Sequence, residues 1–350
     1  MKIIHSADIH LGSSLNSQFG DFGKARRKEI LGAFRKMVDY AEQNGIKNIL
    51  LSGDIFDNDR PAKLDKEFFY GTVKNNPDIT FFYLRGNHDT DESYTQKLEN
   101  LKTFSESWVK YSIGDIDIHG IEINENNAVS LYSTLDTARS RKNIVMLHGQ
   151  TSSSKGNGLI DLSALRGKNI DYLALGHIHK YSAGKLDERG TYAYSGCLEG
   201  RGFDELGEKG FIVLDTDDFS HKFIPFSTRI IHEFPVDISR SENPSHAAKI
   251  AEQAMTCDSG DIVRIVLTGE IGYDNDTLSD TVKAYIGTKC AFAAVKDKTE
   301  QKLDISKYEN SISLKGEFVR SVLGSGEDDL TKRRLIAAGL RILEGRMPEL

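Results

Sequence analysis

The sequence predicts an α/β protein in which helices enclose two β-sheets in four layers (α/β/β/α), followed by a smaller C-terminal α+β domain. Three observations predict this fold. Five short apolar segments each end in a polar, glycine-containing turn, amphipathic helical segments alternate with the first of them, and hairpin-like segments lie further along the chain. With 350 residues the chain is long enough for one large and one small domain.

The five apolar segments are the predicted core strands. Each contains a run of consecutive apolar residues, which favours strands buried on both faces. They occupy residues 2–10, 47–54, 80–89, 143–150 and 171–179.

Two segments with helical periodicity separate the first three of these strands. Apolar residues recur at helical spacing over 27–45, where Gly45 is placed to end the helix, and a second helical stretch covers 65–75. Strand–helix–strand alternation favours an α/β core. Four hairpin-like segments add antiparallel strands to this core, so two sheets between helices are more plausible than a simple doubly wound sheet. These segments are 115–123, 128–134, 191–198 and 210–217.

The pattern changes after residue 232, where we expect the domain boundary. Residues 1–232 form the predicted large domain and 233–325 the smaller one, which contains helices over 245–255 and 276–287 and a strand over 261–271. The remaining segment, 326–350, is predicted to be a basic amphipathic helix over 328–347 with a short tail.

Composition places the chain in the cytoplasm. No apolar run approaches the ~20 residues that cross a bilayer, and the first residues are typical of a strand rather than a signal peptide. The three cysteines are far apart and are expected to be free thiols. A net charge of −7 argues against a surface uniformly adapted to nucleic acid but is compatible with a local basic groove.

Each predicted core strand ends in residues of the types that bind metals. In open α/β sheets ligands gather at the carboxyl ends of the strands. Imidazole and carboxylate ligands suit Mn, Fe or Zn, and two such ions joined by a carboxylate would activate water for attack on phosphorus. A nearby histidine that is not a ligand could protonate the leaving oxygen. The candidates are Asp8, His10, Asp54, Asp57, Asn87, His88, Asp89, His148, His177 and His179.

Taken singly, these motifs have ordinary interpretations. A D-x-H at a strand end is more often a turn, and G-D-x-x-D is a common turn or helix-cap signal. All of these motifs in this order, each at the end of a predicted strand, are much less probable as a set of unrelated turns than as parts of one metal site.

The series D-x-H, G-D-x-x-D, G-N-H-D, H and G-H-x-H resembles that of the calcineurin-like metallophosphoesterase superfamily. The phrases "IIHSADIHLGSSL", "LSGDIFDNDRP" and "YAYSGCLEGRGFDELGEKGFIVLD" are similar to its SbcD-type DNA repair nucleases, and the segment after residue 312 resembles YhaO-like proteins. The resemblance implies a C-terminal domain that caps the active site and touches DNA.

The resemblance also implies roles for single residues. Asp8, His10, Asp54 and His179 would hold one metal ion. Asp54 would bridge to a second ion held by the set Asn87, His148 and His177. His88 would face the scissile phosphate, with Asp89 positioning it. The expected ions are two Mn²⁺, with Fe, Zn or Mg as alternatives.

One residue departs from the family pattern. Several nucleases of this branch have a histidine three residues after the bridging aspartate, where this chain has Asp57. A carboxylate cannot play the same donor role, so the role of Asp57 and the polarity of any exonuclease activity stay open.

Basic residues near the predicted strand ends are candidate DNA contacts, although for each one alone a solvated surface cation is the more common interpretation. They are Arg26, Arg27, Lys28, Arg60, Arg85 and Arg201.

The functional prediction is a two-metal DNA nuclease, the nuclease subunit of an SbcCD-like DNA double-strand break repair complex. The resemblance implies an SbcC-type, SMC-like coiled-coil ATPase as partner, a homodimer, a cytoplasmic, nucleoid-associated location and no membrane contact. Two alternatives are a phosphoesterase for a small molecule or phosphoprotein, and an inactive scaffold. The filled ligand positions argue against the scaffold.

Overall fold

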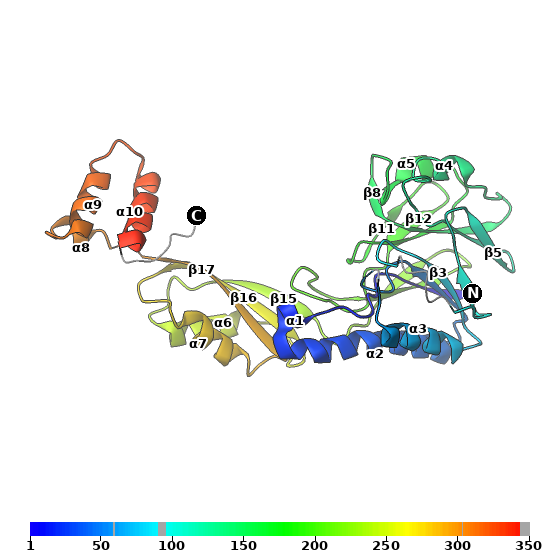
Figure 1. Cartoon of the computed structure of the whole chain (residues 1–350), viewed down its shortest axis with the longest axis horizontal. Coiled ribbons are helices and arrows are strands. Elements are labelled where there is room, and N and C mark those ends of the chain that lie inside the picture. The colour runs from blue at the N-terminus through cyan, green and yellow to red at the C-terminus, as the bar shows by residue number, and fades with distance from the viewer. Residues whose placement is uncertain (59, 90–95, 303, 344–350) are drawn as a thin grey trace. The chain divides into compact units, whose positions relative to one another are not determined.

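The computed structural model describes residues 1–58, 60–89, 96–302 and 304–343. The chain divides into two compact units, Met1–His232 with Gly260–Ile262, and Glu233–Ser259 with Val263–Leu350 (Figure 1). Residues on both sides of the predicted limit at 325 therefore belong to the second unit.

Two six-stranded mixed sheets form the centre of the first unit. The first sheet has the order β14-β13-β1-β2-β3-β4, and the second has the order β11-β12-β10-β7-β6-β5. The strands of the first are β1 (Lys2–Ser6), β2 (Asn48–Ser52), β3 (Thr80–Leu84), β4 (Leu101–Thr103), β13 (Gly210–Asp215) and β14 (His221–Pro225). Those of the second are β5 (Val109–Ile113), β6 (Ile116–Gly120), β7 (Lys142–His148), β10 (Tyr172–Gly176), β11 (Ser182–Lys185) and β12 (Thr191–Tyr194). The prediction of an α/β fold with two mixed sheets is confirmed.

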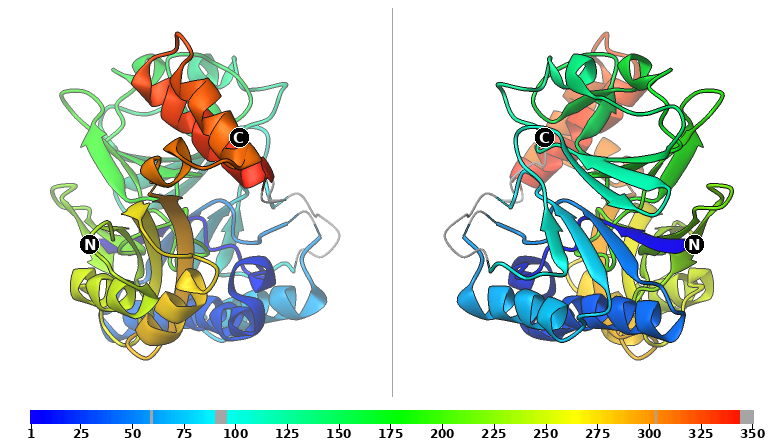
Figure 2. Two further views of the ribbon diagram at one scale, coloured as in Figure 1. Left: turned by 90° about the vertical axis from the view of Figure 1, so that its left-hand side faces the viewer. Right: turned by 90° about the vertical axis from the view of Figure 1, so that its right-hand side faces the viewer.

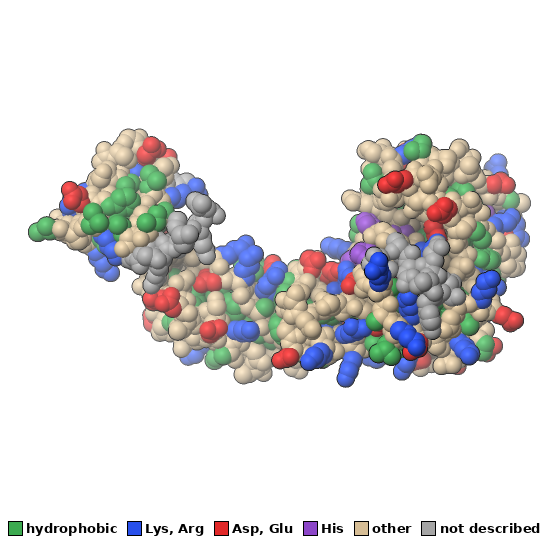
Figure 3. All heavy atoms as spheres, viewed as in Figure 1, with side chains coloured by type: hydrophobic (Ala, Val, Ile, Leu, Met, Phe, Trp, Pro, Cys, Tyr) green, Lys and Arg blue, Asp and Glu red, His purple; other side chains and the backbone are tan. Residues whose placement is uncertain are grey.

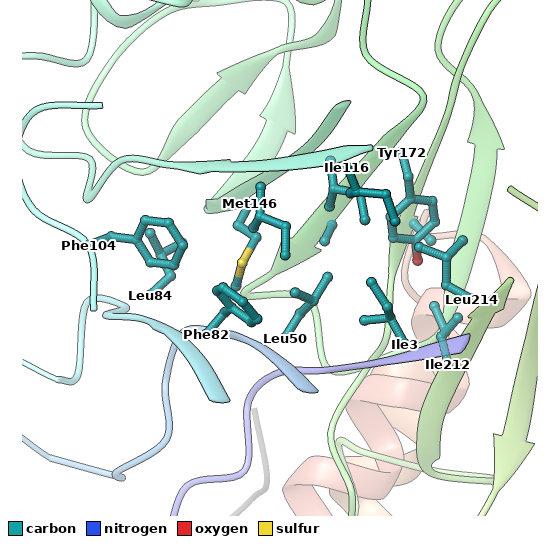
Figure 4. Close-up of a cluster of buried hydrophobic side chains, with 14 residues drawn as sticks. Ile3, Leu50, Phe82, Leu84, Phe104, Ile116, Met146, Tyr172, Ile212 and Leu214 are labelled. Atoms are coloured by element: carbon teal, nitrogen blue, oxygen red, sulfur yellow. The ribbon is translucent and has the colours of Figure 1, made fainter. Parts of the chain in front are cut away.

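An apolar core lies between the two sheets (Figure 4). Leu50 and Phe82 reach it from the first sheet, and Met146 and Tyr172 reach it from the second. Successive side chains of a strand point to opposite faces, so Leu147, next to Met146, packs in a separate cluster on the outer face of the second sheet. Strands buried on both faces explain the uninterrupted apolar runs in the sequence.

Helices cover the outer faces of both sheets (Figure 2). On the first sheet, the ring centroid of Phe69 in α3 (Lys63–Lys74) lies 5.5 Å from that of Tyr83, and Tyr40 in α2 (Gly23–Gln43) lies 5.2 Å from Phe211. On the second sheet, α4 (Leu131–Thr134) and α5 (Leu162–Leu165) pack on the outer cluster. The shorter elements of this unit are α1 (Asn16–Phe19), η1 (Gly20–Phe22), β8 (Gln150–Ser152) and β9 (Leu159–Asp161).

One predicted strand is wrong. Residues 128–134 form turns and the short helix α4 instead. The side chain of Asn127 accepts a hydrogen bond from the Asn124 N–H at 2.9 Å, which folds the chain into a turn, and the Asn127 carbonyl accepts the Leu131 N–H at 2.9 Å. This local hydrogen bonding outweighs the preference of Val, Tyr and Thr for strands.

The second unit contains a three-stranded sheet of order β15-β16-β17 with two helices. These elements are β15 (Ile231–Asp237), β16 (Ile262–Ile271), β17 (Phe292–Gln301), α6 (Pro244–Ala254) and α7 (Leu278–Ile286). Three helices follow: α8 (Ser306–Glu309), α9 (Leu314–Leu323) and α10 (Asp329–Leu343). Val319 of α9 packs on Ile336 and Leu340 of α10.

The final residues of the predicted C-terminal helix and its tail, 344–350, lie outside the described residues. None of the helices described over 1–343 combines the length and the apolar character that a bilayer-spanning segment needs.

Candidate metal centre

The carboxyl ends of strands from both sheets meet at one edge of the first unit. The Asp8 N–H, just after β1, donates to the Gly53 carbonyl at 3.0 Å. The His177 N–H, just after β10, donates to both carboxylate oxygens of Asp8 at 2.9 Å. These bonds join the ends of β1, β2 and β10. Histidine side chains gather at the surface of this unit (Figure 3).

Asp8, His10 and His179 form the first triad, whose ligand atoms all lie within 4.8 Å of one another. The Nε2 atoms of His10 and His179 are 3.2 Å apart. Asp8 and His10 are buried and His179 is partly exposed, so the triad opens to solvent on one side. Burial raises the pKa of Asp8 to about 6 and lowers that of His10 to about 4.

Asp54, His148 and His177 form the second triad. His148 Nε2 lies 3.2 Å from Asp54 Oδ2, and Asn87 Oδ1 lies 3.1 Å from His148 Nε2 and 3.2 Å from His177 Nδ1. His148 Nδ1 donates to the Ser52 carbonyl at 2.9 Å, so Nε2, which faces Asp54 and Asn87, is the ring nitrogen placed to act as a ligand. His177 and His179 therefore lie in different triads, and Ile178 between them packs on the outer apolar cluster.

Asp54, a member of the second triad, also reaches the first. Its Oδ2 is 3.2 Å from His148 Nε2 and 4.0 Å from His10 Nε2, while its Oδ1 accepts the His88 N–H at 2.9 Å. Burial raises the pKa of Asp54, but the hydrogen bond and charge of His148 outweigh burial and hold that pKa well below its usual range. For His148, burial lowers the pKa, but the hydrogen bond and the charge of Asp54 outweigh burial and raise that pKa to about 9.

This donor set suits two divalent cations. Each triad combines imidazole nitrogen with carboxylate oxygen, and Asn87 adds an amide oxygen near the second. These ligands suit first-row divalent ions. When bound, such ions supply Lewis-acid stabilisation of a phosphoryl oxygen and lower the pKa of water.

His88 lies beside the first triad. The centroid of its ring is 5.2 Å from that of His10, and its Nδ1 donates to the Asp57 carbonyl at 2.9 Å. A carbonyl can only accept, so the hydrogen of a neutral His88 ring is on Nδ1 and Nε2 has a free lone pair.

Asp89 holds the backbone rather than the ring of His88. Its buried carboxylate accepts the N–H groups of Ile55, Phe56 and Gly86 at 2.9–3.1 Å. It thus ties the loop after β2 to the loop after β3, and the orienting partner of the His88 ring is the Asp57 carbonyl.

Three charged residues lie behind the first triad. Asp57 Oδ1 is 3.3 Å from His10 Nδ1 and accepts from Arg201 Nη1 at 2.7 Å. Arg201 Nη2 also donates to Glu205 Oε1 at 2.8 Å, and that oxygen is 2.7 Å from His179 Nδ1. Glu205 is not among the residues predicted from the sequence, where its only signal is its position in a segment similar to the nucleases.

The predicted DNA contacts fall into three groups. Arg26 is fully buried, where it pairs with Glu29 and, at 3.0 Å, with Glu199, so its prediction as a DNA contact is wrong. Arg27, Arg85 and Arg201 are in ion pairs with Asp65, Glu122 and Glu205. Lys28 and Arg60 are exposed.

Comparisons with known proteins find relatives of this chain. A protein of Bacillus subtilis (strain 168) named uncharacterized metallophosphoesterase YhaO is 27% identical over 77% of this chain and 72% of its own length. DNA double-strand break repair protein Mre11 of Sulfolobus acidocaldarius is 24% identical over 81% of this chain and 79% of its own. A subunit of the nuclease SbcCD of Staphylococcus epidermidis is 26% identical over 64% of this chain and 69% of its own.

The predicted family resemblance is confirmed by a family model. The model for calcineurin-like phosphoesterases matches residues 1–181, which include both triads, Asn87 and His88. Because this match spans more than half of the 350 residues, the chain belongs to the calcineurin-like phosphoesterase family.

Proposed function

We propose that this protein is a two-metal phosphodiesterase that cleaves DNA, the nuclease subunit of an SbcCD-like repair complex. The observation that carries the proposal is the position of Asp54, whose Oδ2 lies within 4.0 Å of a ring nitrogen from each triad. One carboxylate between two His/Asp donor groups is what a pair of cations acting on one phosphate requires.

The residues of the chain have distinct roles in this proposal. The first triad and Asp54 would hold one cation, and Asp54 with Asn87, His148 and His177 would hold the other. His88, held through Nδ1 by the Asp57 carbonyl, presents Nε2 to the substrate and, when protonated there, donates that proton to the leaving oxygen. Asp89 fixes the loops that carry Asp54 and His88.

The choice of DNA as substrate is supported by the relatives. Two of the three relatives described above bear the names of a DNA repair protein and a nuclease. Of the six predicted basic contacts, Lys28 and Arg60 are exposed and available to contact phosphates. By the same relationship, we propose an SbcC-type coiled-coil ATPase as partner, a homodimer and Mn²⁺ as the metal.

The test is cleavage of linear and hairpin DNA in Mn²⁺, with and without the neighbouring ATPase. Wild-type protein should cut DNA, and Asp54→Ala and His88→Ala should each lose at least about 10²-fold in rate. His88→Ala should keep both cations, because His88 is in neither triad. Absence of DNA cleavage by the wild-type protein in Mn²⁺ would refute the nuclease proposal.

A second candidate is hydrolysis of a small-molecule or protein phosphoester, because the metal centre alone does not select the substrate. The relative named YhaO, similar over 77% of the chain, is a metallophosphoesterase by name and not a nuclease by name. Parallel assays with bis-p-nitrophenyl phosphate and a cyclic nucleotide separate the two candidates. Activity on these compounds without DNA cleavage would favour the second.

A further inference from the structure

A chain of charged side chains supports the first triad from behind. It consists of Asp57, Arg201 and Glu205, which we call the clamp. Arg201 is central, since Nη1 donates to Asp57 Oδ1 at 2.7 Å while Nε and Nη2 donate to Glu205 Oε1 at 3.1 and 2.8 Å. The Arg201 N–H donates to the other Glu205 oxygen at 2.7 Å.

The two ends of the clamp meet the two histidines of the first triad at the same ring atom. Glu205 Oε1 lies 2.7 Å from Nδ1 of His179, and Asp57 Oδ1 lies 3.3 Å from Nδ1 of His10. At His179 the hydrogen bond to Glu205 keeps the hydrogen on Nδ1, with Arg201 Nη2 also 3.0 Å from that nitrogen. At His10, whose Nδ1 makes no hydrogen bond to the described residues, the negative charge of Asp57 favours the same position. Nε2 of each ring is then left with a free lone pair, which is the form that binds a cation. These two Nε2 atoms are 3.2 Å apart.

Burial makes the clamp rigid. The side chain of Glu205 is 5% exposed and that of Arg201 is 19% exposed. The main chain of His179 is fixed as well, because its carbonyl accepts from the Lys209 ammonium at 2.9 Å. An arginine with three side-chain nitrogens already bonded to carboxylates is poorly placed to contact DNA phosphates, so its role lies inside the protein.

Asp57 links the clamp to His88. Its carboxylate faces His10 and Arg201, and its carbonyl accepts from Nδ1 of His88. A carboxylate held in this way is not available to donate a proton to substrate.

We propose that Asp57, Arg201 and Glu205 act as positioning residues that fix the rings of His10 and His179 for the cation of the first triad, with Asp57 also setting the orientation of His88. This inference rests on the two-cation centre of the proposed function, but it does not depend on the substrate.

The test measures Mn²⁺ binding to the whole chain by calorimetric titration and by electron paramagnetic resonance. Wild-type protein should bind two Mn²⁺ and show a spin-coupled pair. Glu205→Ala should lower the affinity for one Mn²⁺ by about 10–100-fold. The second triad should still bind its Mn²⁺, so the spin-coupled signal should be replaced by that of an isolated ion. Glu205→Gln keeps an oxygen that accepts from Nδ1 and should retain most of the affinity.

Glu199→Ala is the matched control. Glu199 is also buried and also pairs with an arginine, Arg26, at 3.0 Å, but it belongs to neither triad. It should lower stability and leave both Mn²⁺ affinities unchanged. Asp57→Ala, at a partly exposed position, is a second variant that should weaken the binding of the same single Mn²⁺, and it keeps the test available should Glu205→Ala not fold.

Two results would refute the positioning role of the clamp without refuting the two-cation centre. One is a folded Glu205→Ala or Asp57→Ala variant that binds both Mn²⁺ as tightly as the wild-type protein. The other is a loss of Mn²⁺ affinity in Glu199→Ala that equals the loss in Glu205→Ala. Wild-type protein that binds fewer than two Mn²⁺ would refute the proposed function as well, and failure to cut DNA by protein loaded with two Mn²⁺ would refute the substrate alone.

Discussion

Four residues of the two triads have left-handed backbone conformations. The φ angles of Asp8, His10 and Asp54 are 51–52°, and that of His177 is 100°. Residues other than glycine rarely adopt such angles, and each costs of order 1–3 kcal/mol. The surrounding hydrogen bonds hold them there, among them the bond from the Asp8 N–H to the Gly53 carbonyl. The strain coincides with the residues that bring the ligands together, as is common at functional sites.

Gly53 provides a test of how closely the loops pack. It has a φ of 93°, and a Cβ added there would lie 2.2 Å from His148 Nδ1. Gly53→Ala should therefore displace His148, reduce stability by more than the ~1–2 kcal/mol of left-handed strain, and weaken Mn²⁺ binding at the second triad. Thermal unfolding and Mn²⁺ titration measure both effects.

Gly114→Ala is the control for this prediction. Gly114 also has a positive φ, 59°, but nothing lies within 4 Å of an added Cβ. This variant should lose only the strain energy and bind Mn²⁺ normally. Normal Mn²⁺ binding by Gly53→Ala would contradict the close packing around His148.

His5 makes stability depend on pH independently of the metal centre. Its ring is fully buried between Tyr172 Oη, 2.9 Å from Nδ1, and the Leu175 carbonyl, 3.2 Å from Nε2. Burial lowers its pKa from 6.5 to about 3. The unfolded chain therefore binds a proton between pH 6.5 and about 3 that the folded chain does not, and the free energy of unfolding falls as pH falls through this range.

Because of His5, the free energy of unfolding should fall by about 2 kcal/mol between pH 8 and pH 5. Urea unfolding at both pH values measures it. His5→Gln, although less stable at pH 8, should lose less stability on acidification than the wild-type protein by about this amount. Equal losses in the two proteins would show that His5 is not kept neutral in the fold.

Residue types in the motifs predicted the members of both triads, but the clamp could not be predicted in the same way. Glu205 lies 26 residues after His179, and nothing in its neighbourhood indicates that its carboxylate lies 2.7 Å from that ring. Arg26 illustrates the same limit, because a basic cluster in the sequence does not reveal that one of its members is fully buried.

At the scale of elements, the core strands were predictable because burial on both faces gives each an apolar run that stops where the ligands begin. The helix α2 was predictable from its apolar periodicity, and the structure has it over Gly23–Gln43. The helix α4 was not, because polar turn bonds of Asn124 and Asn127 and a hydrogen bond from Trp108 to the Leu131 carbonyl stabilise it.

The start of α2 gives a prediction at this scale. Arg26→Ala leaves Glu199 buried without its partner and should reduce stability by about 3–5 kcal/mol. Lys28→Ala, two residues later on the exposed side, should change stability by less than about 0.5 kcal/mol and weaken DNA binding in low salt. Chemical unfolding and DNA binding at two salt concentrations distinguish these effects. Loss of DNA binding in a folded Arg26→Ala variant with unchanged stability would contradict its structural role.

At the scale of the whole molecule, the metal centre joins the two sheets of the first unit. Asp8 and Asp54 follow strands of the first sheet, and His148 and His177 come from the second. Cations bound only by the folded chain should stabilise it, by about 2.7 kcal/mol for each ion at a hundred times its Kd. Unfolding curves with Mn²⁺ and with a chelator measure this gain, which should fall in Asp54→Ala. Unchanged stability in saturating Mn²⁺ would contradict binding at the triads.

The central claim is that both triads act together on one phosphodiester. The most direct measurement is the rate of DNA cleavage by metal-free protein as Mn²⁺ is added from zero to two equivalents. We predict that cleavage stays near background until the second site fills and then rises to its maximum at two equivalents. Full activity with one bound Mn²⁺, or with none, would contradict the claim.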